Sequence, residues 1–441
     1  MQTRFDAIIM GAGLAGSTAA ILLARAGWKV AIVEKQRFPR RKVCGECIAA
    51  SNLPLLDALG VGPQFDASAG PALRQMAFMQ GARTFVADLP PAPHARHHWG
   101  RALGRETLDT LLLAQAGRAG AVVLQPWAVQ AFDGPAGNHR CEIRSVESAH
   151  SLMLHAPVLI AAHGSWEALP SDRAGRRQGR QASDLFAFKA NFSGGALADG
   201  LLPVLSFEGG YGGMVTADQG TLTLACCIRT DRLEACRLAA PGLRAGEAVE
   251  ALLKRECQGV AHALKNAHRD GAWLATGPIA PGIRLRSDEN FFRIGNAAGE
   301  AHPIIGEGMS MAMQSAWLLC AELLRPDAKP GARLQAAWQR QAGERYAVEW
   351  RRNFAPRLRL AAAFAQLAMR PGASSPLLAL LRWWPALLTQ GARWGGKVRC
   401  APGPACVDWL AGGAGFIARG NLRQGGLDRL RVKKINPWDP S

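Results

Sequence analysis

"FDAIIMGAGLAGSTAAILLARAGWKVAIVEK", residues 5–35, decides the fold of this chain. An apolar run leads into three glycines spaced G-x-G-x-x-G: Gly11, Gly13 and Gly16. A run rich in alanine and leucine then ends at Gly27, and a second apolar run ends in Glu34. This order predicts a β-strand, an α-helix and a second, parallel strand, which together open a Rossmann-type sheet.

Each part of this unit has a physical role in binding a dinucleotide. Gly11 permits a tight turn, Gly13 lets the backbone approach a pyrophosphate, and Gly16 lets helix and strand pack closely. The helix N-terminus offers unpaired N–H groups and a positive dipole end to phosphates. Glu34, eighteen residues after Gly16, is placed to accept hydrogen bonds from ribose hydroxyls. The unit predicts a bound dinucleotide without distinguishing NAD from FAD.

Composition limits the remaining classes of function. The 441 residues suggest two or three domains, and the net charge is +18. From residue 351 onward, fifteen lysines and arginines face only three acids. Such an excess attracts anionic lipid, nucleic acid or acidic ligands, but no nucleic-acid reader motif accompanies it. Ten cysteines without regular spacing indicate a reducing, cytoplasmic setting and no metal site, and no apolar run is long enough to span a membrane.

A second glycine-rich segment lies far along the chain. "GNAAGEAHPIIGEGMSMAMQSA", residues 295–316, follows the short apolar run "FFRI". Its glycines and Pro303 predict a loop, and the spacing of methionine and alanine after Gly308 predicts a helix with one apolar face. The segment is either an ordinary joint between a loop and a helix or part of a cofactor site.

Taken in order, these pieces resemble the FAD-dependent oxidoreductases of the flavin monooxygenase and geranylgeranyl reductase superfamily, over residues 1 to about 325. The segment 295–316 looks like the family's second FAD motif, GDAA…P…G.G, and "KVCGE", residues 42–46, looks like the K-x-C-G stretch of the reductases. The likeness is closest to the members that accompany type III polyketide synthases, in secondary metabolism. It implies FAD as the cofactor and NAD(P)H as the electron donor.

The resemblance also implies which residues bind FAD. The first motif and the strand after it contribute Gly11, Gly13, Ala15, Gly16, Glu34 and Lys35. The following segment and the next helix contribute Lys42, Cys44, Gly45 and Arg105. The second motif contributes Gly295, Asn296, Gly306, Gly308 and Met309. No metal ligand is expected.

Two positions depart from the family pattern. Asn296 stands where the family has Asp, and His163-Gly164 stands where the family has its D-G motif. An amide still accepts a hydrogen bond from a ribityl hydroxyl but carries no charge. The sequence alone therefore predicts that Asn296→Asp leaves FAD binding equal or tighter.

The expected fold is α/β, with a Rossmann-type, GR2-like FAD-binding domain that is discontinuous in sequence. We expect this domain to comprise residues 1–75, 100–175 and 275–350. An antiparallel β-sheet substrate domain is expected over residues 76–99 and 176–274, where "LFAFKANF" and "TLTLACCIR" alternate as strands do. A basic helical region is expected over residues 351–441.

Three side chains are candidates for catalysis: Cys44, Tyr211 and His302. Tyr211 lies in "GGYGGMV", which looks like the glycine-aromatic stretch lining the reductases' lipid pocket, and it binds substrate or closes a turn. Cys44 begins a C-x-x-C pair and packs near the flavin by family likeness, with a structural or a chemical role. His302 lies inside the second motif. His97, His98 and His163 are weaker acid–base candidates, and the adjacent Cys226 and Cys227 are expected in the core.

The C-terminal region combines apolar helical faces with arginines and the pair Trp383-Trp384. This pattern is typical of a helix lying on an anionic membrane, but also of a helical cap over a substrate tunnel. Both alternatives imply a hydrophobic small-molecule substrate, and the first adds peripheral contact with the inner face of the membrane. Nucleic acid is not an expected partner.

The resulting functional hypothesis is an NAD(P)H-dependent monooxygenase that hydroxylates a hydrophobic aromatic, polyketide or lipid substrate. The first alternative is a geranylgeranyl-reductase-like enzyme that reduces C=C bonds of a prenyl or polyene lipid. The second is a non-catalytic, FAD-containing lipid-binding protein, degenerate at Asn296 and His163. Halogenation is disfavoured because the W-x-W-x-I-P stretch of tryptophan-type halogenases is absent.

Overall fold

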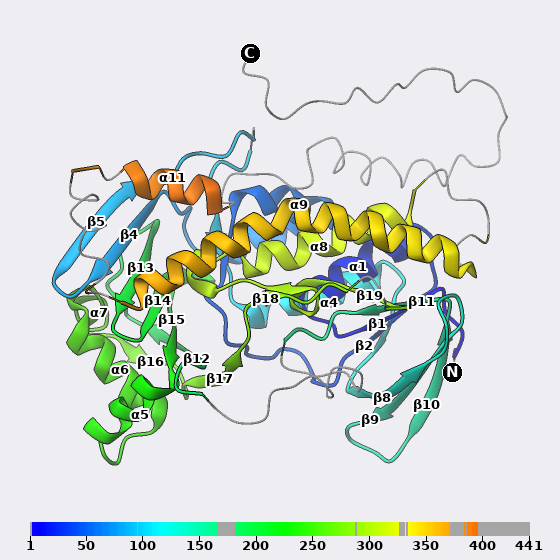
Figure 1. The fold of residues 1–441 in the computed structure, drawn as a ribbon, viewed down its shortest axis with the longest axis horizontal. Helices are drawn as coiled ribbons and strands as arrows, with labels where there is room; N and C mark the ends of the chain where they lie inside the picture. Colours follow the sequence, from blue (N-terminus) through cyan, green and yellow to red (C-terminus); the bar gives the residue numbers. More distant parts are fainter. Residues whose placement is uncertain are drawn as a thin grey trace.

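The computed structural model describes residues 2–94, 96–165, 181–286, 289–325, 331, 334–370, 372, 383–384 and 386–395. Its first unit is a five-stranded parallel sheet in the order β19-β11-β1-β2-β7 (Figure 1). The strands are β1 (Ala7–Met10), β2 (Val30–Val33), β7 (Val122–Leu124), β11 (Val158–Ala161) and β19 (Phe292–Arg293). β1 pairs in register with both β2 and β11, so the first glycine loop leaves from the centre of the sheet.

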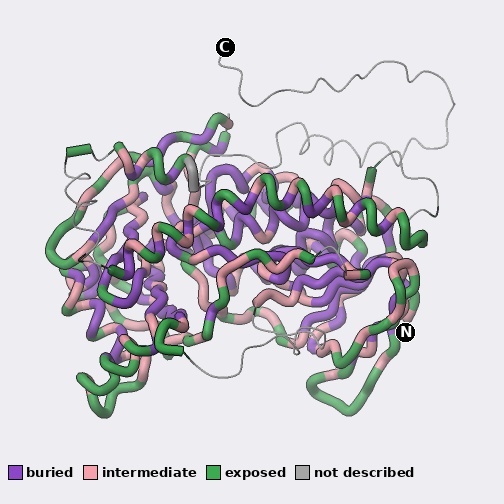
Figure 2. Tube along the Cα trace, viewed as in Figure 1, coloured by how far each residue is buried: buried purple, intermediate pink, exposed green. Residues whose placement is uncertain are grey.

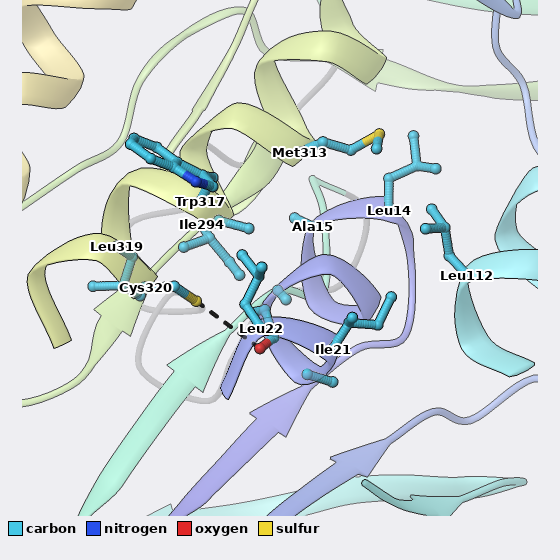
Figure 3. Packing of buried hydrophobic residues seen from close by; sticks show 14 of the residues in the cluster. Leu14, Ala15, Ile21, Leu22, Leu112, Ile294, Met313, Trp317, Leu319 and Cys320 are labelled. Carbon is cyan, nitrogen blue, oxygen red and sulfur yellow. Dashed lines mark hydrogen bonds between the residues drawn. The ribbon is translucent and has the colours of Figure 1, made fainter. Parts of the chain in front are cut away.

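Helices cover one face of this sheet and a β-meander covers the other. The helices are α1 (Leu14–Arg25), α4 (Arg105–Arg118) and α8 (Gly308–Leu323). The meander comprises β8 (Trp127–Asp133), β9 (His139–Ser145) and β10 (Ser151–Ala156). In Figure 3, Leu22 of α1 and Trp317 of α8 lie in one buried cluster, and the Cys320 thiol reaches the carbonyl oxygen of Ala19 at 3.9 Å. α8 thus closes on α1 across nearly 300 residues of sequence.

The second unit is an eight-stranded sheet that carries helices on one side. Its strands are β4 (Gln75–Gln80), β5 (Arg83–Asp88), β12 (Leu185–Ser193), β13 (Leu201–Phe207), β14 (Gly210–Ala217), β15 (Thr221–Arg229), β16 (His268–Arg269) and β17 (Leu274–Ile279). The helices are α5 (Thr230–Ala239), α6 (Ala245–Glu256) and α7 (Gln258–Ala263). Their apolar sides share a buried cluster with one face of the sheet.

Short elements link the two units. Two small ladders pair β3 (Cys47–Ile48) with β6 (Arg101–Ala102) and β18 (Gly282–Ile283) with β20 (Gly299–Glu300). The short helices are α2 (Leu53–Ala58), α3 (Gly62–Ser68), η1 (Ala50–Asn52), η3 (Asp218–Gly220), η4 (Gly295–Ala297) and η5 (Pro303–Ile305). β3 follows the "KVCGE" segment, so that segment lies at the boundary between the units.

Two C-terminal helices cover the free face of the eight-stranded sheet. The long α9 (Ala336–Ala368) runs along both units, and α11 (Ala386–Gly395) lies beside its end and beside β5 (Figure 1). Buried residues of α9 and α11 join Phe78, Tyr211 and Cys227 in one apolar cluster. The basic tail after residue 395, expected above to be helical, lies outside the described residues.

The expected α/β fold class is confirmed, with one difference in the second sheet. This sheet is antiparallel except that β13 pairs in parallel with β4. The parallel pair arises because β4 and β5 come from the chain before α4, so β4 is not the hairpin neighbour of β13. The domain boundaries given above stay a prediction. No helix within the described ranges is both long and apolar enough to cross a bilayer.

Candidate functional site: a cofactor cradle open to an apolar cavity

The first glycine loop has the packing that a dinucleotide cradle requires. Gly11 has φ +106°, and a Cβ there would lie 2.7 Å from the carbonyl oxygen of Ala162. A Cβ on Gly16 would lie 1.9 Å from the carbonyl oxygen of Gly11, so helix and loop pack too closely for any side chain. Gly13 differs, because the nearest atoms to its Cβ would be the guanidinium ends of Arg105 and Arg40, at 3.7 and 3.8 Å. Gly13 therefore faces open space lined by cations.

Glu34 ends β2 next to this loop. Its carboxylate accepts hydrogen bonds from the backbone N–H groups of Ala12 and Gln36, each at 3.0 Å. Only 7% of the residue is exposed, and the Arg40 guanidinium lies 3.7 Å away. Lys35, predicted to contribute to the cofactor site, is half-buried and does not line the cavity described below.

Three cations converge in front of Gly13: Arg40, Lys42 and Arg105. Arg105 makes two hydrogen bonds to the Asp109 carboxylate, at 2.8 and 2.7 Å, and Arg40 approaches the same carboxylate at 3.6 Å. Burial, together with the positive charges of Arg105 and Arg40, lowers the pKa of Lys42 from 10.5 to about 8. A diphosphate at this position would relieve the repulsion among the three cations. The site therefore fits the pyrophosphate of FAD.

We expect Lys42→Met to weaken FAD binding by about tenfold at pH 7, the effect of about one charge-assisted contact. In the wild-type protein, FAD affinity should fall as the pH rises through about 8, because Lys42 then loses its proton and no longer attracts the anion. Fluorescence titration of apoprotein with FAD between pH 6 and 9 measures both effects. A variant whose affinity kept the wild-type pH dependence would contradict the assignment to Lys42.

The second glycine-rich segment lies against the first. Gly295 has φ +60°, its N–H donates to the Ser315 hydroxyl at 2.7 Å, and a Cβ there would lie 2.9 Å from the Cβ of Ala15. Gly306 adopts φ 62° and ends η5 just before α8 begins. The predicted residues Gly295, Asn296, Gly306, Gly308 and Met309 line the same cavity as Gly13, Ala15 and Arg105. The structure thus brings the two motifs together around one space.

Asn296 lies in a polar network built around Glu300. The Asn296 amide donates to Glu300 at 3.3 Å and to the Ser165 hydroxyl at 3.4 Å. Ser165 also donates to Glu300, at 2.9 Å, and Arg284 donates to the second carboxylate oxygen at 2.8 Å. Glu300 is 6% exposed and lines the cavity. One carboxylate therefore joins the loop at Ser165 to the loop at Asn296.

This network reverses the expectation for Asn296→Asp that the sequence alone gave. A carboxylate at that position would replace a hydrogen bond to Glu300 with repulsion between like charges. We now expect Asn296→Asp to weaken FAD binding by about tenfold, which corresponds to about 1.4 kcal/mol. Adding Glu300→Gln should restore the affinity, since an amide can donate to the new carboxylate. Titration of the two single variants and the double variant tests this coupling, and additive effects would contradict it.

The cavity extends from the cradle into the second unit and has a volume of about 540 Å³. Its far walls are mostly apolar. They come from β13, β14 and β17, from α9 (Leu360, Ala363, Phe364, Leu367) and from α11 (Leu387, Leu388, Gly391, Ala392). The cavity is thus continuous from the residues of both glycine motifs to this apolar part under the C-terminal helices, which we call the chamber. Of the two alternatives given for the C-terminal region, this arrangement favours a helical cap that covers a substrate tunnel, formed by α9 and α11.

Tyr211, which lines the cavity, forms a polar pair with His302, which lies behind it and does not itself line the cavity. The Tyr211 hydroxyl lies 3.1 Å from Nδ1 of His302. Burial raises the pKa of Tyr211 well above 10, and burial lowers the pKa of His302 below 6.5 although Glu300 opposes that shift. Both side chains are neutral at pH 7. Because the phenol is the stronger acid, we assign the hydroxyl as donor and Nδ1 as acceptor, which leaves the imidazole proton on Nε2.

Of the cysteines and histidines named in the sequence analysis, some line the cavity and others lie in the core or in structural contacts. Cys44 lines the cavity, with the Glu46 N–H 3.5 Å from its sulfur, and Gly45 lines it too. Cys226 and Cys227 are buried in β15, and burial raises the pKa of both thiols. His97 pairs with Asp57 at 2.7 Å outside the cavity lining, as a structural contact. The backbone of His163 packs within 2.8 Å of where a Gly11 Cβ would lie.

Sequence reasoning missed a buried ion pair at the boundary of the two units. Glu46 adopts φ 59° and accepts hydrogen bonds from the Arg105 N–H at 2.9 Å and from the Thr223 hydroxyl at 2.6 Å. It also pairs with Lys189 of β12. The loop that carries Cys44 and the start of α4 are thereby held to the substrate sheet. Glu46 lies within the quoted "KVCGE", but a pairing across 143 residues leaves no local signal. Arg40 and Glu300 were missed likewise.

Comparisons with known proteins agree with this geometry. Residues 4–196 match the model of an FAD binding domain. The conditioned medium factor receptor 1 of Dictyostelium discoideum is 25% identical over 74% of this chain and 64% of its own length. The menaquinone reductase of Mycobacterium tuberculosis is 28% identical over 77% of this chain and 80% of its own length. The chain thus spans less than two thirds of the Dictyostelium relative.

Solved structures share the fold at low identity. A myxobacterial chondrochloren halogenase has a TM-score of 0.70 at 18% identity, covering 94% of this chain and 97% of its own. A geranylgeranyl bacteriochlorophyll reductase-like protein from Thermoplasma acidophilum has a TM-score of 0.65 at 15% identity, over 93% and 96%. A probable FAD-dependent monooxygenase from Pseudomonas aeruginosa has a TM-score of 0.60 at 18% identity, over 89% and 99%.

Proposed function

We propose that this chain, whose residues 4–196 match an FAD binding domain, is an FAD-dependent flavoenzyme of the halogenase, monooxygenase and reductase type. The reaction is NAD(P)H-dependent hydroxylation of a hydrophobic aromatic, polyketide or lipid substrate. Each turnover would consume one NAD(P)H, one proton and one O2, and would release NAD(P)+, water and the hydroxylated product. Bound FAD would pass the two electrons of NAD(P)H to oxygen.

The observation that supports this proposal is the continuity of the cradle with an apolar chamber lined by α9 and α11. Oxygen activation by a reduced flavin requires that water be excluded and that the substrate be held near the cofactor. The side chains of Phe364 and Leu388 line the chamber from α9 and α11. Tyr211 lines the chamber, is 1% exposed, and has its hydroxyl 3.1 Å from Nδ1 of His302. An apolar body with one oxygen function, such as a phenol or a quinol, matches these walls.

The roles of the chain's own residues follow from their positions. Arg40, Lys42 and Arg105 would hold the pyrophosphate, and Glu34 would face the adenosine ribose. Tyr211 would accept a hydrogen bond from a substrate hydroxyl while it donates its own proton to Nδ1 of His302, so a proton can pass from the substrate through the phenol to the imidazole. Glu300 supports this pair electrostatically, because it favours a protonated His302.

The second candidate is reduction of a C=C bond in a prenyl or polyene lipid. Two observations favour it: the 28% identity to menaquinone reductase along most of the chain, and the location of the "KVCGE" and "GGYGGMV" segments on the cavity wall. Halogenation has support in the shared fold of the chondrochloren halogenase. These reactions differ in their use of oxygen and halide.

One set of assays separates the candidates. Purified holoprotein is mixed with NADPH or NADH and a panel of phenols, quinones and polyprenyl lipids, while oxygen uptake and products are followed. Hydroxylation predicts substrate-dependent oxygen uptake and a product heavier by one oxygen atom. A hydrogenated product formed under argon would replace the proposal with reduction, and a brominated product formed only with added bromide would replace it with halogenation. Flavin that stays oxidised with NADPH and NADH under argon, for every compound, would indicate a non-catalytic FAD protein.

A further inference from the structure

The helix α11 separates the apolar chamber from the surface. Leu388 and Ala392 are buried and line the cavity, whereas Gln390 and Arg393 on the opposite side are exposed. In Figure 2 the traces of α11 and of the adjacent end of α9 alternate between buried residues and exposed or intermediate ones. A molecule that passed between these helices would enter the chamber after crossing one layer of side chains.

Trp383 and Trp384 stand at the start of this layer and are unusually exposed for tryptophan. Their exposed fractions are 86% and 64%, so both rings face the surroundings and not the core. Removing two such rings from water is normally favourable, because each aromatic ring carries a large apolar area. The pair is therefore a surface feature that needs a partner with an apolar interior and a polar boundary.

The charge of the segment that carries the tryptophans identifies that partner. Between Glu349 and Asp408 the chain contains nine arginines and lysines and no acid. Among the described residues, Arg359 and Arg370 of the α9 segment and Arg393 of α11 are exposed. Tryptophan at the level of lipid headgroups, together with a cationic rim, is what a helix on an anionic bilayer presents. A nucleic acid would use the charge but not the outward tryptophans beside an apolar chamber.

We propose that α11 and the tryptophans just before it, with Trp383, Trp384 and Arg393 turned outward, dock on an anionic lipid bilayer, and that apolar substrate enters the chamber from the bilayer past α11. The second clause rests on the proposed function, since it requires an apolar substrate. The first clause does not, because vesicle binding is independent of any reaction.

Cosedimentation with vesicles tests the docking. Holoprotein is mixed with vesicles of phosphatidylcholine alone or with 30% phosphatidylglycerol. We expect binding to the anionic vesicles that weakens in high salt. The double variant Trp383→Ser/Trp384→Ser should bind at least tenfold more weakly, and Arg393→Gln should weaken binding by several-fold. The matched controls are Leu238→Ser on α5, where the leucine is 83% exposed, and Arg144→Gln on β9, which should bind as the wild type does.

The outcomes distinguish docking from function. Wild-type protein that fails to pellet with anionic vesicles, or a tryptophan variant that pellets equally well, would overturn the docking surface. With a water-soluble substrate the tryptophan variant should turn over normally, and with the same substrate class embedded in vesicles it should turn over more slowly. Equal rates on vesicle-embedded substrate would overturn entry from the bilayer. An inactive wild-type protein that still binds vesicles would refute the proposed reaction and leave the docking intact.

Discussion

Gly16→Ala is expected to abolish FAD binding, with a loss of at least about 100-fold in affinity. The added Cβ would lie 1.9 Å from the carbonyl oxygen of Gly11, a backbone atom that cannot rotate away. Relief requires that α1 move off the loop, which costs about 3 kcal/mol by the usual measure of overpacking and displaces the N–H groups at the helix N-terminus. The measurement is the flavin content of the purified protein and FAD titration of its apoprotein.

Two further glycine variants distinguish a loss of FAD binding from a loss of folding. Gly117→Ala on α4 places its Cβ 3.9 Å from Val123, an ordinary contact, so it should bind FAD normally. Gly13→Ala places its Cβ in open space in front of Arg105 and Arg40. That variant should melt as the wild-type apoprotein does yet bind FAD more weakly, because only a ligand can meet the new methyl group. Full flavin content in both Gly13→Ala and Gly16→Ala would refute the cradle.

Tyr211→Phe is expected to lower kcat by about 100-fold while KM changes little, because positioned proton transfer contributes at least about that factor. The substitution keeps the ring that packs in the cavity and removes only the hydroxyl bonded to His302. The matched control is Tyr346→Phe, which removes the chain's other phenol. Tyr346 is equally buried but donates to the backbone carbonyl of Arg293, so its loss should cost about 1 kcal/mol of stability and leave kcat unchanged.

The same pair predicts a pH dependence with a definite sign. Neutral His302 accepts the Tyr211 proton through Nδ1, and protonated His302 cannot. Because burial lowers the pKa of His302 below 6.5, activity should be retained at pH 6.5 and should fall as the pH drops through that lowered pKa. Tyr211→Phe should remove this acid limb from the kcat profile. An unchanged limb, or a phenylalanine variant with wild-type kcat, would show that the pair does not take part in the reaction.

The parts of the fold that sequence could predict are those with local signals. Gly11, Gly13, Gly16 and Glu34 lie within thirty residues of one another, and the alternation of strand residues marked the second sheet. The parallel pairing of β4 with β13 had no such signal. It depends on which edge of the second sheet is still unpaired when the chain returns to that sheet.

The site shows the same division. The two glycine motifs could be paired through the family resemblance, and their contact at Gly295 and Ala15 follows from the packing of α8 on α1. The role of Glu300 could not be predicted, because its contact with Asn296, four residues earlier, depends on how the loop folds, and its partner Ser165 lies 135 residues away in sequence. The reversed expectation for Asn296→Asp has this cause.

The packing of α8 on α1 has a consequence for how the protein is made. The first strands and α1 leave the ribosome early, but the helix that covers α1 begins at Gly308, and β19 adds the edge strand of the parallel sheet only at Phe292. The cofactor cradle therefore cannot close until about 300 residues have been synthesised. During that interval the apolar side of α1 is uncovered, as is usual for chains rich in long-range contacts. FAD therefore cannot bind its complete cradle before α8 has been synthesised, up to Leu323.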